Sequence, residues 1–210
     1  GNLNGWQDRL IISVDMGFDE KIIDDFRKNR ERLCISFSEV FKRWQTESKK
    51  GFYDWFQEEV ESFGRSTLKA HLNYLEKMKQ YQGIVNEESI SALINPPPAT
   101  ILIRTIHRIF KNNGFNSSKI IEKTVEYLHS PYIKDIPIVK IFSMMLATIA
   151  RKAAAGQKNS PNQGMYNDIS IISGLLPYCD AMFIDNTCYN YLNERPLVEE
   201  INYDTKVFSQ

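Results

Sequence analysis

The chain has 210 residues, 42% of them hydrophobic, which is enough to bury a core, and we expect residues 1–210 to form a single domain. Lysine plus arginine and aspartate plus glutamate both number 26, so the net charge of zero excludes a global basic field for nucleic acid. The three cysteines are odd in number and lack zinc spacing, which argues against disulfides or structural zinc and favours a reducing, cytoplasmic compartment.

The sequence contains neither a run of about 18 apolar residues nor a leader with basic and then apolar residues. We therefore expect no membrane partner and no secretion. Because the chain begins at Gly1 rather than at Met, we also expect it to be a processed or partial chain.

Residues 1–130 are predicted to be rich in helices. A β-branched run at 10–14 predicts a short strand before Asp15. Apolar residues at helical spacing then predict two long amphipathic helices, at about 20–44 and 52–82, separated by a Lys-Lys-Gly sequence.

Prolines and glycines divide the middle of the chain. Three prolines at 96–98 remove backbone donors and force an extended backbone, so we expect a boundary between helices there. Further helices are predicted at 99–112, from a capping serine pair at 117–118 to the Ser-Pro at 130–131, and at 138–155.

Residues 131–210 are predicted to form a C-terminal α/β portion. Its expected elements are a helix that begins at Asn167 or Asp168, a buried strand at 181–184, helices at about 187–192 and 197–201, and a strand at 206–208. Helices that alternate with strands favour a parallel sheet, so the fold class is α/β, mostly α by content.

Charge is unevenly distributed in this portion. Residues 140–167 contain four bases and no acid, whereas 168–204 contain seven acids and one base. The acids are Asp168, Asp180, Asp185, Glu194, Glu199, Glu200 and Asp204. A basic segment therefore adjoins an acidic one.

Two of these acids occupy positions that suit metal binding. Asp168 opens a predicted helix and Asp185 follows a predicted buried strand, so in a parallel sheet both are expected at the edge where strands end and helices begin. Mg²⁺ is typically held by one or two carboxylates together with phosphate oxygens, which suffices for phosphodiester hydrolysis. The structural alternative is that Asp168 is a helix N-cap and Asp185 a turn residue.

The order of acid, helix, turn, strand and acid resembles the last third of PIN-domain nucleases. The stretches 150–158 (ARKAAAGQK), 164–168 (GMYND) and 176–186 (LPYCDAMFIDN) look like those of uncharacterised bacterial PIN-like proteins, and the likeness covers about 135–210. This resemblance implies a PIN-like parallel sheet flanked by helices. It also implies that Asp168 and Asp185 bind catalytic Mg²⁺ or Mn²⁺ in an endonuclease that acts on RNA.

The remaining acids of the pattern are assigned in the same way. Asp180 precedes the predicted strand, so about 16 Å of strand would separate it from Asp185, and we expect it to brace the backbone more than to bind metal. A PIN domain begins with a strand ending in Asp and adds a helical acid later. Asp15 and Glu39 are the upstream candidates, and the alternative is that the first strand lies before Gly1, which would leave this chain poor in metal and inactive.

The bases Arg151, Lys152 and Lys158 precede Asp168 and are candidates for binding substrate phosphates. The structural alternative is that Arg151 and Lys152 complement the dipole at a helix C-terminus. The three histidines are scattered over three predicted helices without paired spacing, and the tryptophans fall at helical periodicity, so neither group is expected in a site.

Two other functions compete with the nuclease. One is a catalytically inert PIN-like or helical module that binds nucleic acid or a partner protein, such as a regulator or a second copy. The other is a structural four-helix scaffold, which would lack parallel strands near residues 181–184.

Overall fold

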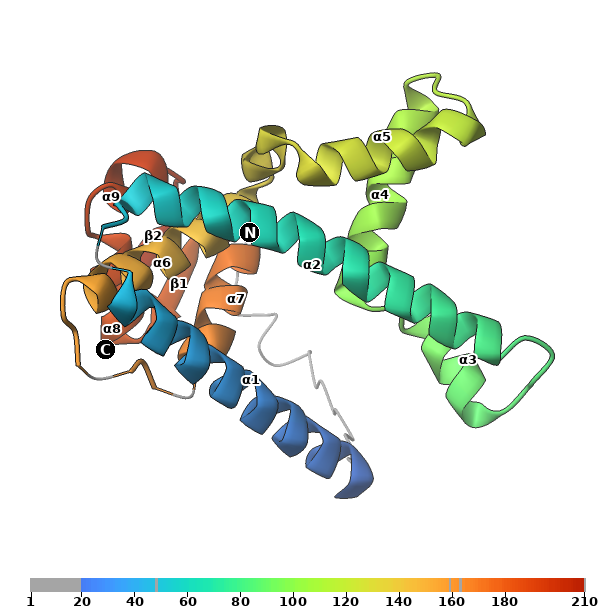
Figure 1. Cartoon of the computed structure of the whole chain (residues 1–210), viewed down its shortest axis with the longest axis horizontal. Coiled ribbons are helices and arrows are strands. Elements are labelled where there is room, and N and C mark those ends of the chain that lie inside the picture. The colour runs from blue at the N-terminus through green and yellow to red at the C-terminus, as the bar shows by residue number, and fades with distance from the viewer. Residues whose placement is uncertain (1–19, 48, 159, 163, 210) are drawn as a thin grey trace, which may run out of the picture.

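The computed structural model describes residues 20–47, 49–158, 160–162 and 164–209, and it is mostly helical (Figure 1). The helices of the N-terminal half are α1 (Glu20–Thr46), α2 (Phe52–Gln80), α3 (Glu87–Ile94), α4 (Pro98–Asn112) and α5 (Ser117–His129). The C-terminal half contains η2 (Pro131–Asp135), α6 (Pro137–Ala154), α7 (Met165–Leu175), η3 (Leu176–Tyr178), β1 (Ala181–Ile184), α8 (Asn186–Leu192), α9 (Leu197–Glu200) and β2 (Lys206–Ser209). Within these ranges no helix combines the length and the apolar character that crossing a bilayer requires.

Helix α6 is the centre of the hydrophobic core. It is apolar on nearly all sides, and a helix of this kind must be covered on all sides by protein. Helices α1, α2 and α7 pack against it, and residues along its whole length are fully buried, among them Val139, Met144 and Ala153. Trp44 of α1 and Trp55 of α2 are also wholly buried, which confirms that these two tryptophans belong to the core.

Helix α2 extends beyond this core and supports an arm built from α3, α4 and α5 (Figure 1). The backbones of α2 and α5 approach each other closely at Gly64. A Cβ atom at this position would lie 1.9 Å from the Leu128 carbonyl oxygen. Glycine is therefore required where the arm joins the core.

A small parallel sheet lies at the C-terminal end of the chain. Strands β1 and β2 pair in parallel, with Ala181 opposite Lys206 and Ile184 opposite Ser209. Helices α8 and α9 form the crossover between them, as parallel pairing requires. Both strands were predicted, and their parallel pairing makes the four-helix scaffold wrong. The prediction that β1 is a buried strand was also wrong, because only Met182 of its four residues is buried. The predicted strand at 10–14 lies outside the described residues, among which the sheet has two strands.

Most predicted helices are confirmed to within three residues, but the predictions for α3 and for the cap of α5 were wrong. Helix α3 was not predicted, although Asn86 and Ser89 form a reciprocal capping box at its start. Helix α5 is capped by Asn116, whose Oδ1 accepts the Lys119 N–H, and not by the serine pair that follows.

Replacing Gly64 by alanine should destabilise the protein, because the new methyl group would overlap the Leu128 carbonyl and force α2 and α5 apart. We expect the free energy of unfolding to fall by about 1–3 kcal/mol in chemical denaturation. Gly174→Ala is the matched control, since its Cβ would meet only Ile138 Cδ1 at 3.9 Å. Equal stability of the two variants would contradict the close approach.

Candidate metal centre

Asp168 lies in the first turn of α7, and its position corrects the prediction for the start of that helix. The helix begins at Met165, three residues before Asp168, and its N-cap is Gly164. The Asn162 Oδ1 accepts the backbone N–H groups of Gly164 and Met165. The Asp168 N–H already donates to the Gly164 carbonyl at 3.0 Å. Asp168 is therefore not an N-cap, and the prediction that it or Asn167 opens the helix was wrong.

Asp185 is the N-cap of α8, directly after β1. Its Oδ1 accepts the backbone N–H of Thr187 at 2.7 Å and that of Cys188 at 3.1 Å. An N-cap aspartate satisfies donors that the first helical turn leaves unpaired. Asp185 therefore stabilises the first turn of α8, whether or not it also binds a metal ion.

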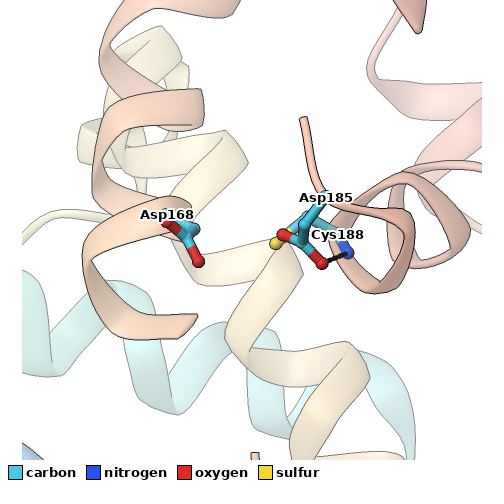
Figure 2. A group of neighbouring side chains, drawn as sticks. All are labelled: Asp168, Asp185 and Cys188. Carbon is cyan, nitrogen blue, oxygen red and sulfur yellow. Dashed lines mark hydrogen bonds between the residues drawn. The ribbon is translucent and has the colours of Figure 1, made fainter. Parts of the chain in front are cut away.

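The fold brings the two aspartates together with Cys188. One ligand atom from each of Asp168, Asp185 and Cys188 lies within 4.8 Å of the others. Figure 2 shows Asp168 on α7 and Asp185 at the start of α8 on facing sides of the site, with the Cys188 sulfur next to the Asp185 carboxylate. Cys188 is buried, and its thiol contacts Met165 Sδ at 3.4 Å. Cys188 was not predicted, because nothing near it in the sequence suggested a partner.

The protonation equilibria of the three groups differ. Burial and the nearby negative charge of Asp185 raise the pKa of Asp168. Burial opposes ionisation of Asp185 too, but its hydrogen bonds with Cys188 and Thr187 outweigh burial and lower its pKa. Burial, followed by the hydrogen bond and the charge of Asp185, raises the pKa of Cys188 well above the ordinary thiol range, so the sulfur stays protonated.

An open pocket of about 490 Å³ lies in front of the two carboxylates. Asp168, Asp185 and Asn186 supply its polar groups, and apolar residues of α7 and β1 supply the rest. One of these, Phe183, is 73% exposed and stacks on Phe208 of the neighbouring strand, with ring centroids 5.2 Å apart. This exposed ring pair was not predicted, although both residues stand at paired positions of the two predicted strands.

The other predicted acids lie elsewhere. Asp180 stands before β1 and Asp185 after it, so the strand separates them as predicted, and the Asp180 carbonyl accepts the Lys206 N–H at 3.0 Å. Glu39 is exposed on α1 and is not a member of the cluster. Asp15 lies outside the described residues.

The predicted phosphate-binding residues Arg151 and Lys152 both form ion pairs with Glu194. The Arg151 guanidinium lies 3.2 Å from a Glu194 oxygen and also donates to the Arg195 carbonyl, and Lys152 pairs with the second Glu194 oxygen. The two residues stand in the last turn of α6, where they also complement the helix dipole. Lys158 is exposed in the segment that follows.

Removing the cap should cost stability, whereas removing only the charge should not. We expect Asp185→Ala to lower the free energy of unfolding by about 1 kcal/mol, because two N–H groups lose their acceptor. Asp185→Asn keeps an acceptor oxygen and should stay close to wild type. If the two variants lost the same stability in chemical denaturation, the cap would not be the cause.

Asp168→Asn should stabilise the protein at neutral pH in the presence of a metal chelator. Because the folded state raises the pKa of Asp168, its ionisation costs stability as the pH rises above the ordinary aspartate value of 3.8. Below that value both states hold the proton, and the advantage of the variant should vanish. Thermal unfolding of both proteins across this pH range measures the difference, and an advantage that persists at low pH would contradict it.

No family model, curated protein or solved structure matches this chain, so its function rests on the geometry described above.

Proposed function

We propose that the protein is a metal-dependent nuclease of PIN-like fold, with Asp168 and Asp185 as its metal ligands. The observation that carries the proposal is the convergence of these two carboxylates, from the first turn of α7 and the end of β1, on one open pocket. The two residues are 17 positions apart in sequence, and they meet at the edge where a parallel strand ends and helices begin. Active sites of parallel α/β folds commonly occupy this edge.

The donor set suits a hard divalent cation. Two carboxylates are the typical protein contribution to a Mg²⁺ or Mn²⁺ site, with water and substrate oxygens completing the coordination. The protonated thiol of Cys188 is a poor ligand for such ions, so we assign it to packing against Met165 rather than to coordination. Burial and then the charge of Asp185 raise the pKa of Asp168, and a bound cation would offset both.

When bound, the metal would supply Lewis-acid stabilisation of charge on the scissile phosphate and lower the pKa of an attacking water. The protein's own groups would fix the geometry. Asp185 is held in place by two backbone N–H groups, and Asp168 is held by the first turn of α7. The rigid N-cap therefore orients one ligand, and the position of α7 relative to α8 sets its distance from the other.

Substrate binding by stacking fits this pocket better than binding by charge. The exposed ring of Phe183 lines the pocket beside both carboxylates, and stacking of a base on an aromatic ring contributes about 1–3 kcal/mol. Arg151 and Lys152 share the one carboxylate of Glu194, which engages both side chains and offsets one of their two charges. We therefore propose single-stranded RNA as the substrate, with few phosphate contacts and a shallow salt dependence.

Metal binding and cleavage test this function together. We expect Mn²⁺ to raise the melting temperature of the wild-type protein and to support cleavage of single-stranded RNA. Asp168→Asn and Asp185→Asn should lose both effects, because each removes one carboxylate. Asp180→Asn is the matched control, since it makes the same change at the opposite end of β1 and should behave as wild type.

The proposal fails if the wild-type protein neither binds Mn²⁺ nor cleaves RNA or DNA and Asp168→Asn is indistinguishable from it. Phe183→Ala separates substrate binding from metal binding. It should keep the Mn²⁺-dependent rise in melting temperature while weakening RNA binding by roughly tenfold, which corresponds to about 1.4 kcal/mol of lost stacking.

A second candidate function is an inert module that binds a protein partner through the helical arm. An apolar groove of about 600 Å³ lies between the end of α2 and α3, and it is lined by Leu75, Met78, Val85, Ile90 and Leu93 among others. Val85 is 87% exposed and Leu93 60%, and such patches mark interaction sites. This function requires no metal, so the Mn²⁺ experiments above distinguish it from the nuclease.

A further inference from the structure

A second pocket, of about 430 Å³, lies between α1, α2, α6 and α7, and the metal centre does not use it. Its volume is within the usual range for small-molecule sites. Aromatic rings from all four helices line it, namely Phe37, Trp44, Phe63, Phe142 and Tyr166. Such a concentration of rings around an open volume is unusual for a surface that has only to be solvated.

Four of these rings form a continuous wall. Tyr166 contacts Phe37 with centroids 6.0 Å apart and Phe142 with centroids 5.5 Å apart, and Phe142 contacts Phe63 at 6.4 Å. All three contacts are edge-to-face. Tyr166, Phe142 and Phe63 are only partly buried against the core, so part of each ring remains accessible in the pocket.

One carboxyl group in this pocket forms neither an ion pair nor a hydrogen bond among the described residues. Glu59 of α2 has no ion pair or hydrogen bond there, whereas its neighbour Glu58 binds Arg43 at 2.7 Å and Lys50 at 2.6 Å. The two arginines that line the pocket are compensated, because Arg43 also faces Glu47 and Arg65 pairs with Glu61. The uncompensated charge of the pocket is therefore that of Glu59.

We propose that this pocket is a binding site for a small organic cation, an ammonium compound. The faces of aromatic rings attract ammonium groups, and a carboxylate at the same site adds a direct charge partner. The ring wall of α1, α2, α6 and α7 supplies the first of these interactions and Glu59 the second. This site is independent of the proposed nuclease activity.

Cation binding should be linked to the pH. Burial, followed by the charge of Glu58 and opposed by that of Arg43, raises the pKa of Glu59 to about 7. The other charged or titratable groups that line the pocket are Arg65 of α2 and Tyr166 of α7, and α6 contributes none. A cation prefers the ionised carboxylate, so proton and cation compete. The affinity should therefore rise by roughly tenfold from about pH 6 to about pH 8 as Glu59 loses its proton.

Titration calorimetry with choline as the probe tests the proposal. Choline carries both a quaternary ammonium and a hydroxyl group, and dimethylbutanol is its uncharged carbon isostere. We expect saturable choline binding to the wild-type protein that strengthens with pH, and binding of dimethylbutanol that is at least about tenfold weaker, because the neutral isostere loses both the cation–π and the charge interactions. Both comparisons, of choline at two pH values and of choline with dimethylbutanol, use the wild-type protein.

Glu59→Gln should lose most of the choline affinity and its pH dependence while keeping the fold. Glu76→Gln is the matched control, because it makes the same change at an exposed position of the same helix. The proposal is overturned if wild-type protein shows no saturable binding at either pH, if dimethylbutanol binds as tightly as choline, or if Glu59→Gln binds choline as wild type does.

Discussion

The need to cover helix α6 on every side determines the architecture of this protein. A helix with buried residues along its whole length contributes a large free energy on folding only if neighbouring helices exclude water from all its faces. Helices α1, α2 and α7 do this, and each of them contributes a side chain to a candidate site. The position of both candidate sites follows from how these helices lie against α6.

Helix α7 connects the two candidate sites. Tyr166 on α7 belongs to the aromatic pocket, while Asp168, two residues later, faces Asp185. Residues two apart on a helix point in different directions, so one short helix can serve a pocket on one side and a metal centre on the other. A shift of α7 along α6 would change both sites together.

Each candidate site contains a carboxyl group whose ionised form is disfavoured, and the balance of causes differs between the two sites. Burial and a like charge disfavour the ionised form of Asp168, whereas at Glu59 burial is the main cause and the charge of Glu58 adds to it. In each case a bound cation would remove the penalty, a metal ion at one site and an organic cation at the other. Perturbed pKa values of this kind are typical of functional sites.

Much of the fold was predictable because helix and strand patterns are local. Apolar periodicity predicted α1, α2 and α6, the three prolines placed the start of α4, and the short apolar run at 181–184 predicted β1. Local patterns misplaced the start of α7, because its N-cap is Gly164 and not Asn167 or Asp168. They also missed α3, whose eight residues are too few for a clear period.

The order of residues along the chain was enough to place an apolar helix and a short strand between Asp168 and Asp185, and so to predict that the two carboxylates share a site. The approach of Cys188 to them, the ion pairs of Glu194 with Arg151 and Lys152, and the position of Glu59 among aromatic rings of four helices depend on the tertiary structure. The physical reason is that burial and charge pairing depend on which distant residues come into contact, and spacing along the chain does not record such contacts.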